Sequence, residues 1–251
     1  GHGFGPVDER ECLQVLRTAF EKGISHFDTA GFYARGQSER LIARALHTQR
    51  QQIFISTKGG LAWRENSVHH CGGRIELKQA LCESLKRLKT DYIDLFQLHW
   101  PDPATPLNES LDALISFQKE GLIRFWGVGN LTAEQIETYI APSANVPHQV
   151  HFNPIHKTTK SVLTIGHSGN RCLNCIVSPF EQGLLTEGRS SVGLEALGNR
   201  DIRRRNPYFR SEEIRSWLTR LSELCRTTKI PKVNLILLWI LSQRGVDALI
   251  P

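Results

Sequence analysis

The chain of 251 residues has no methionine, little net charge and no long apolar run. Its longest apolar stretch extends only from Leu235 to Leu241, whereas a membrane-spanning helix needs about 18 such residues. The formal charge of +6 permits an anionic ligand but does not indicate nucleic acid. The opening residues also lack the basic and then apolar composition of a secretory signal. We therefore expect a cytoplasmic protein without membrane or nucleic-acid partners.

Cysteine pairs with metal-site spacing are also scarce. Cys172 and Cys175 form a single CxxC motif, and no second pair stands at zinc-site spacing from it. The motif leads into an apolar strand, so we expect cysteines that pack and no metal site. The absence of methionine, together with an end at Pro251 directly after a predicted strand, leads us to expect a fragment whose N- and C-terminal ends are truncated.

Strand and helix patterns alternate along the rest of the chain, whose 40% hydrophobic content excludes disorder. Helical periodicity predicts helices at residues 8–22, 38–46, 76–88, 108–120, 132–140, 158–166, 211–226 and 231–243. Apolar and β-branched runs predict strands at residues 24–27, 53–57, 92–98, 123–128, 147–152, 173–178 and 246–250. We expect Ser38 and Thr132 to cap their helices.

This alternation predicts an α/β fold with a parallel sheet. The length of the chain and its strand pattern fit a (β/α)8 TIM barrel formed by one domain over residues 1–251. In this barrel, residues 1–5 would be the end of an eighth strand. An open doubly wound sheet is the alternative. That fold usually has a GxGxxG turn after its first strand, and the glycines at the start of this chain do not have that spacing.

Polar residues follow consecutive predicted strands, where a barrel carries its catalytic groups. They are Asp28, Lys58, His99, Asn130, Gln149, Asn153 and Ser178, with Tyr33 in the loop after Asp28. Taken singly, each has a structural explanation as a cap, a loop residue or a core histidine. Their recurrence at successive strand ends favours catalysis.

The types of these residues suit proton transfer to or from an oxygen. A tyrosine with a pKa of about 10 is a weak acid at neutral pH, and a neighbouring ammonium group lowers that pKa. We expect Lys58 to supply this charge, Asp28 to hold Lys58, and His99 to orient the reacting oxygen. These groups predict acid–base chemistry on a carbonyl or alcohol, with a cofactor performing the redox step.

Five stretches of the sequence resemble the aldo-keto reductases, in order and over nearly the whole chain. They are residues 28–39 (DTAGFYARGQSE), 55–60 (ISTKGG), 91–102 (DYIDLFQLHWPD), 121–130 (GLIRFWGVGN) and 178–185 (SPFEQGLL). The resemblance implies a (β/α)8 barrel that reduces aldehydes or ketones with a nicotinamide cofactor. That cofactor is usually NADPH, and NADH is not excluded.

The resemblance also implies roles for individual residues. It matches Asp28, Tyr33, Lys58 and His99 to a catalytic tetrad. It matches cofactor contacts to Asn130, Gln149, Ser178, Pro179, Gln182, Gly183 and Leu184. Gly129 and Val177 depart from the serine and the stacking aromatic that are usual in the family, and the adenosine-phosphate contacts of the family would follow Pro251.

Two features near the tetrad are open to alternative interpretations. Phe32, Trp63 and Trp100 are expected either to line an apolar substrate pocket or to be ordinary aromatics of the barrel mouth. The polar segment 183–210 is expected either to fold over the cofactor pyrophosphate or to be an ordinary surface loop.

The predicted function is NAD(P)H-dependent reduction of a small carbonyl substrate, with Tyr33 as the proton donor. One alternative is a nicotinamide-binding regulatory or channel-type subunit with little turnover. Another is a cofactor-assisted lyase or epimerase on the same barrel.

Overall fold

The computed structural model describes residues 7–65, 67–187, 197–198 and 201–251. The strand end predicted at residues 1–5 and part of the predicted 183–210 loop lie outside the described residues. The chain forms two compact units. The N-terminal unit comprises Val7–Leu131 with Val146–His148, and the C-terminal unit comprises Thr132–Asn145 with Gln149–Pro251. No helix in the described part of the chain is long and apolar enough to cross a membrane.

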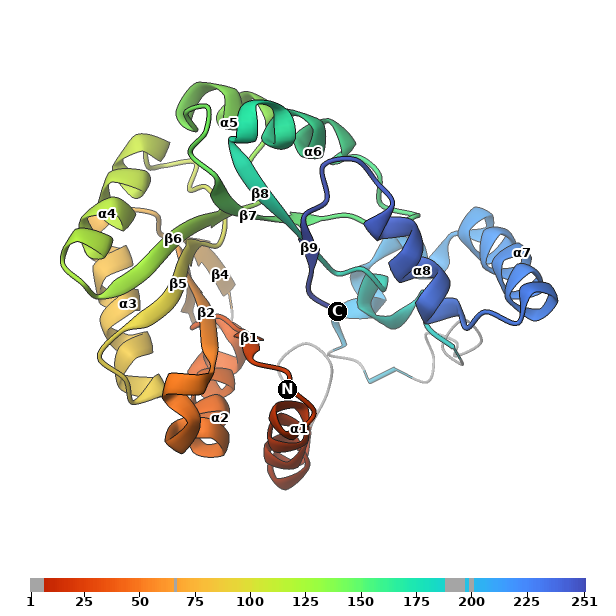
Figure 1. Cartoon of the computed structure of the whole chain (residues 1–251), viewed down its shortest axis with the longest axis horizontal. Helices are drawn as coiled ribbons and strands as arrows, with labels where there is room; N and C mark the ends of the chain where they lie inside the picture. The colour runs from red at the N-terminus through yellow and green to blue at the C-terminus, as the bar shows by residue number, and fades with distance from the viewer. Residues whose placement is uncertain (1–6, 66, 188–196, 199–200) are drawn as a thin grey trace. The chain divides into compact units, whose positions relative to one another are not determined.

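Parallel strands form the centre of the N-terminal unit in the order β1-β2-β5-β6 (Figure 1). Every residue of β5 is buried, as expected of a strand that is covered on both faces. Parallel pairing sets Asp28 level with Ser56, and Lys58 level with Gln97, so the carboxyl ends of these strands share one edge. The strands are β1 (His26–Asp28), β2 (Phe54–Gly59), β5 (Ile93–Leu98) and β6 (Ile123–Gly129).

Helices follow these strands and pack in sequence, α1 against α2, α2 against α3 and α3 against α4. The first begins after Asp8, whose carboxylate accepts hydrogen bonds from the backbone N–H groups of Arg10 at 2.7 Å and Glu11 at 3.1 Å. The helices are α1 (Glu9–Glu21), α2 (Gln37–Leu46), α3 (Arg74–Leu88) and α4 (Leu107–Lys119), with short 3-10 turns η1 (Tyr33–Gly36) and η2 (His47–Gln52).

The prediction that Ser38 caps the second helix is wrong. The cap is Gly36, which has a left-handed φ of 83°. A Cβ at this position would come within 2.5 Å of the Arg87 side chain, so both the conformation and the space favour glycine. The Ser38 hydroxyl instead accepts a hydrogen bond from Thr29 Oγ1 at 2.8 Å, which ties the start of α2 to the end of β1.

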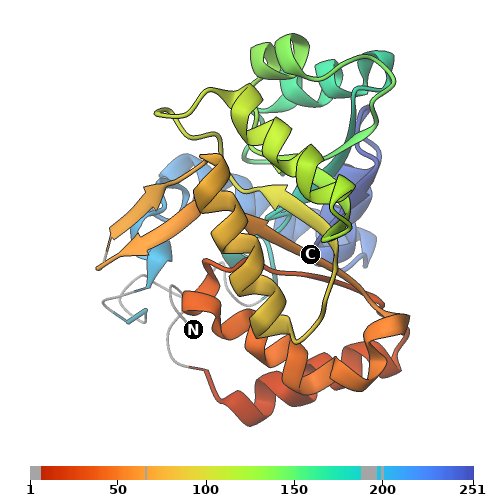
Figure 2. The ribbon, with the colours of Figure 1, turned by 90° about the vertical axis from the view of Figure 1, so that its left-hand side faces the viewer.

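A β-hairpin that the sequence patterns did not predict interrupts the alternation after β2. Strands β3 (Leu61–Arg64) and β4 (Ser67–His70) pair antiparallel, with Trp63 opposite Val68. The hairpin appears as paired orange arrows in Figure 2 and leads into α3. Its strands have four residues each and are mostly exposed, so they lack the apolar run by which the other strands were recognised.

In the C-terminal unit the second half of β7 is followed by β8 and β9 in the order β7-β8-β9, and helix α6 packs on α5 and β8. The predicted cap Thr132 is confirmed: it forms a capping box with Gln135. Asn174 on β8 is fully buried and donates to the carbonyl oxygens of Leu163 at 3.1 Å and Gly245 at 2.9 Å. The strands are β7 (Val146–His151), β8 (Cys172–Val177) and β9 (Ala248–Leu249), and the helices are α5 (Ala133–Tyr139), α6 (Lys160–His167), α7 (Glu212–Thr228) and α8 (Lys232–Leu241).

Candidate active site

An ion pair between Asp28 and Lys58 joins the carboxyl ends of two neighbouring strands in the N-terminal unit. Lys58 Nζ lies 2.6 Å from Asp28 Oδ2 and donates a second hydrogen bond to the Thr29 carbonyl oxygen at 2.8 Å. The side chains are only 3% and 10% exposed, so the pair is held in a poorly hydrated setting. In such a setting opposite charges attract strongly, and each fixes the position of the other.

Tyr33 lies close to this pair because the chain turns sharply after β1. Ala34 and Arg35 adopt left-handed φ angles of 48° and 54°, an unusual conformation for residues other than glycine. Lys58 Nζ lies 5.6 Å from the centre of the Tyr33 ring. The imidazole of His99 meets the same ring edge to face, with centroids 5.7 Å apart. The structure therefore brings all four predicted tetrad residues together within one unit.

The expectation that Lys58 lowers the pKa of Tyr33 is wrong for this structure. Tyr33 remains 39% exposed, but partial burial, together with the carboxylate of Asp28, raises the pKa of Tyr33 to about 12. The positive charge of Lys58, which is paired with Asp28, does not outweigh this loss of hydration. At neutral pH Tyr33 is a neutral phenol that carries its proton.

His99 follows β5 directly and is neutral at physiological pH. Burial, together with the charges of Lys58 and His70, lowers the pKa of His99 to about 3. Its backbone N–H donates to the Gly59 carbonyl oxygen at 2.8 Å, and its own carbonyl oxygen accepts from Asn130 Nδ2 at 3.0 Å. Within the described residues, His99 Nδ1 and Gln97 Oε1 are buried without a hydrogen-bond partner. The end of β5 thus keeps unused hydrogen-bonding capacity beside Tyr33.

Two of the three predicted pocket aromatics lie together next to Tyr33. The rings of Phe32 and Trp63 stack in parallel with centroids 4.9 Å apart, and Trp63 Nε1 donates to the Phe32 carbonyl oxygen at 3.0 Å. Phe32 also meets the His99 ring edge to face at 6.2 Å. Trp100 follows His99 and is 44% exposed. The hairpin therefore supplies an aromatic surface beside the tetrad.

The predicted cofactor contacts are divided between the two units. Asn130 ends β6 in the N-terminal unit and has a left-handed φ of 60°. The remaining residues lie in the C-terminal unit: Gln149 on β7, 5% exposed, and Ser178, Pro179, Gln182, Gly183 and Leu184 in the turn after β8. Ser178 and Gln182 have φ angles of 54° and 56°, so this turn is tightly bent.

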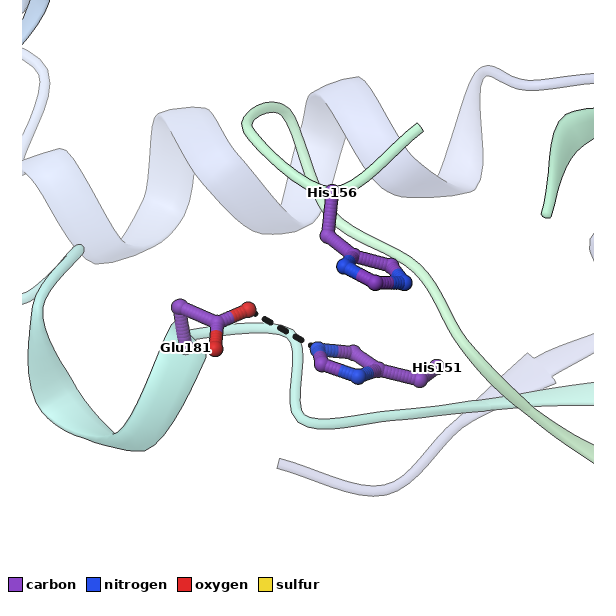
Figure 3. Close-up of side chains that lie close together, drawn as sticks. All are labelled: His151, His156 and Glu181. Carbon is purple, nitrogen blue, oxygen red and sulfur yellow. Dashed lines mark hydrogen bonds and ion pairs between the residues drawn. The ribbon is translucent and has the colours of Figure 1, made fainter. Parts of the chain in front are cut away.

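Sequence patterns missed a polar cluster around that turn. Glu181 is 1% exposed, and its carboxylate contacts His151, whose ring stacks on His156 (Figure 3). This is the one group of three or more potential metal ligands in the described part of the chain. No spacing motif signals it, because Glu181 lies 30 positions from His151 and on a different segment.

Comparisons with known proteins cover the whole chain. A model described as the Aldo/keto reductase family matches residues 1–251. Aldo-keto reductase YhdN of Bacillus subtilis (strain 168) is 30% identical over 253 residues, covering 98% of this chain and 76% of its own length. An NADH-specific methylglyoxal reductase of Escherichia coli (strain K12) is 28% identical over 265 residues, covering 98% of this chain and 79% of its own length.

Solved structures show the same likeness. The structure of a glycerol dehydrogenase from Gluconobacter oxydans matches with a TM-score of 0.83 at 26% identity. The match covers 99% of this chain and 78% of that protein. The fold is therefore the (β/α)8 barrel type predicted from the sequence.

Proposed function

The chain belongs to the aldo/keto reductase family and is an NAD(P)H-dependent oxidoreductase that reduces aldehydes or ketones; we propose that Tyr33 supplies the proton of that reaction. The observation that carries the proposal is the position of Tyr33 between the Asp28–Lys58 ion pair and His99. Its phenol ring lies close to both a fixed cation and a neutral imidazole. Its raised pKa keeps it protonated and ready to donate.

The residues present fit a nicotinamide cofactor. The unpartnered Gln97 Oε1 and His99 Nδ1 leave polar groups at the end of β5 that no described protein atom satisfies. When bound, the reduced nicotinamide supplies the hydride that the protein itself lacks. The residues proposed to hold it are Asn130, Gln149, Ser178, Pro179, Gln182, Gly183 and Leu184. We propose NADPH as the preferred cofactor, and the NADH-specific relative makes NADH the necessary comparison.

The tetrad side chains divide the remaining work. His99, which is uncharged, donates a hydrogen bond to the substrate oxygen without placing a competing positive charge there. Tyr33 transfers its O–H proton to that oxygen as negative charge develops on it. Lys58 stabilises the phenolate that remains, and Asp28 holds Lys58 in position. The phenolate regains its proton from water, which restores the starting state.

The substrate is proposed to be a small carbonyl compound with an apolar part. Support comes from Phe32 and Trp63, which present stacked rings beside Tyr33, and from Trp100, which follows His99. The relatives named for methylglyoxal and glycerol indicate that short carbonyl compounds and alcohols belong in the test panel.

Two broader features of the protein are part of the same proposal. We place the reaction in the cytoplasm, since all six cysteines are free thiols, as in reducing compartments. The match of one family model to residues 1–251 supports a single domain.

The test measures oxidation of NADPH and of NADH in the presence of aliphatic, aromatic and sugar carbonyls. The loss of reduced-nicotinamide absorbance reports the rate. We expect saturable turnover on at least one substrate, and faster turnover with NADPH. Tight cofactor binding without turnover on any carbonyl would favour a regulatory subunit. Product formation without net cofactor consumption would favour a lyase or epimerase.

A further inference from the structure

Glu181 is a buried carboxylate in the turn that follows β8, and three side chains donate hydrogen bonds to it. His151 Nε2 lies 2.8 Å and Asn153 Nδ2 lies 2.7 Å from Glu181 Oε2, while Asn206 Nδ2 lies 2.7 Å from Oε1. Burial opposes ionisation, but these hydrogen bonds outweigh it and lower the pKa of Glu181. The carboxylate is therefore charged and firmly held, although it lies outside the tetrad and no arginine or lysine of the described residues forms an ion pair with it.

The surrounding side chains form a closed network within the C-terminal unit. His156 stacks on His151 with centroids 3.9 Å apart and planes 2° apart, as Figure 3 shows. His156 Nδ1 lies 3.1 Å from the Tyr208 hydroxyl, and His156 Nε2 lies 3.2 Å from Thr158 Oγ1. Both ring nitrogens of His156 and the Nε2 atom of His151 thus have protein partners, as expected of a structural network.

The same three side chains are chemically suited to bind a metal ion, but their geometry does not favour it. A metal ion binds an imidazole nitrogen in the plane of the ring, at about 2.0–2.1 Å for zinc. The rings of His151 and His156 are parallel and stacked, so their nitrogen lone pairs lie in separate planes and do not converge on one ion. Three of the four ring nitrogens are also already engaged: His151 Nε2 with Glu181, His156 Nδ1 with Tyr208 and His156 Nε2 with Thr158.

The turn that carries Glu181 has a backbone that needs such support. Ser178, Glu181 and Gln182 adopt left-handed φ angles of 54°, 43° and 56°, which side-chain-bearing residues rarely take up. A conformation of this kind persists only where the surroundings fix it. The Glu181 network supplies that constraint from outside the turn, through His151 and Asn153 at the end of β7 and through Asn206.

The network holds the turn at more than one point. Besides its bond to Glu181, Asn153 Nδ2 donates to the Ser178 carbonyl oxygen at 3.1 Å. Asn206 Nδ2 also lies 3.4 Å from Gln182 Oε1. Ser178 and Gln182 are both among the proposed cofactor contacts, so movement of Glu181 would displace them together.

We propose that Glu181 is a positioning residue which, through His151, Asn153 and Asn206, holds the turn Ser178–Leu184 in the shape that binds the nicotinamide cofactor. This inference rests on the proposed function, because it takes the turn to be a cofactor site. Glu181 acts on the turn and not on the reacting atoms. Its loss therefore weakens cofactor binding and leaves the chemical step nearly unchanged once cofactor is saturating.

The test compares Glu181→Gln and Glu181→Ala with the wild-type protein. Glutamine keeps the shape of the glutamate side chain but replaces one acceptor oxygen by an NH2 donor. That donor faces the N–H donors already present, so at least one hydrogen bond of the network is lost. We expect the Kd for NADPH to rise about tenfold or more in both variants, in line with the loss of a hydrogen bond to a charged group. We expect kcat at saturating cofactor to change less than about twofold. Thermal unfolding checks that each variant is folded.

A second pair of variants separates positioning from general damage. His151→Gln keeps an N–H donor for Glu181, whereas His151→Ala removes it, so the first should retain cofactor affinity and the second should lose it. Asp247→Asn is the matched control, since Asp247 accepts the Asn174 backbone N–H at 2.7 Å elsewhere in the same unit. We expect its Kd for NADPH to equal that of the wild type.

The outcomes distinguish this inference from the proposed function. A wild-type protein that binds the cofactor and reduces a carbonyl, with unchanged Kd in folded Glu181 and His151 variants, overturns the positioning role alone. A fall in kcat at unchanged Kd overturns it as well. A wild-type protein that binds neither NADPH nor NADH overturns both.

Discussion

The carboxylates of the two sites, Asp28 and Glu181, are secured in different ways. Asp28 is paired with the permanent cation Lys58, as Glu39 is with Arg87 at 2.5 Å, Asp94 with Arg50 at 2.8 Å and, in the C-terminal unit, Asp201 with Arg203 at 2.5 Å. Glu181, by contrast, is held by an imidazole and two amides. Strong charge pairing lies where a proton is proposed to move. Neutral hydrogen bonding lies where a turn has only to keep its shape.

Removing the Tyr33 hydroxyl gives the largest expected effect and tests the first half of this comparison. In Tyr33→Phe we expect turnover to fall by about 10²- to 10⁴-fold, the range typical of a lost general acid. The Kd for NADPH should stay within about twofold, since the ring and the ion pair beside it remain. Steady-state kinetics and a cofactor titration on the same preparation measure both. Near wild-type turnover would exclude Tyr33 as the proton donor.

Breaking the charge pair itself should show how much the N-terminal unit depends on it. Asp28→Asn leaves Lys58 buried without its counterion, and we expect the free energy of unfolding to fall by about 3–5 kcal/mol. Urea unfolding followed by fluorescence measures the change. Glu223→Gln is the control, because the Glu223–Arg226 pair is exposed and should contribute nothing measurable. Equal effects in the two variants would contradict the account.

Removing a neutral buried amide in the C-terminal unit should lower the free energy of unfolding by less than Asp28→Asn does. Asn174→Ala removes the donor to two buried carbonyl oxygens, those of Leu163 and Gly245. We expect a loss of about 1–3 kcal/mol in the free energy of unfolding, the cost of leaving buried acceptors without partners. The same urea experiment applies. A loss larger than that of Asp28→Asn would reverse the proposed ranking of the two units.

The last expected effect is a pH dependence that comes from His99. Its pKa is about 3 in the folded protein and about 6.5 when unfolded. Between these values the unfolded chain binds more protons, so stability rises with pH from about 3 to about 6.5 and is lost on acidification. The slope attributable to His99 is at most about 1.4 kcal/mol per pH unit. His99→Gln should flatten the curve in this window, and an unchanged curve would refute the assignment.

The tetrad was predictable because its signal is local in the sequence. Asp28, Lys58 and His99 each come at the end of a strand, and parallel pairing brings consecutive strand ends to one edge. The alternation of strands and helices was predictable for the same reason, since each element buries an apolar face with its own period.

Other features depend on tertiary contacts that no local pattern records. The Glu181 network joins segments up to 30 positions apart through amide and imidazole groups, which carry no distinctive spacing. The β3–β4 hairpin is short and mostly exposed, so its residues have the composition of a loop. The raised pKa of Tyr33 likewise follows from burial, which the residue types around it do not reveal.

The most direct test of the central claim is the fate of the hydride. Reduced nicotinamide in which both C4 hydrogens are replaced by deuterium is incubated with the protein and a carbonyl substrate, and the product is analysed by mass spectrometry. The account predicts an alcohol with one deuterium on the former carbonyl carbon, and no labelled product above background with Tyr33→Phe. Product that forms without deuterium, or bound cofactor that never transfers it, would contradict the account.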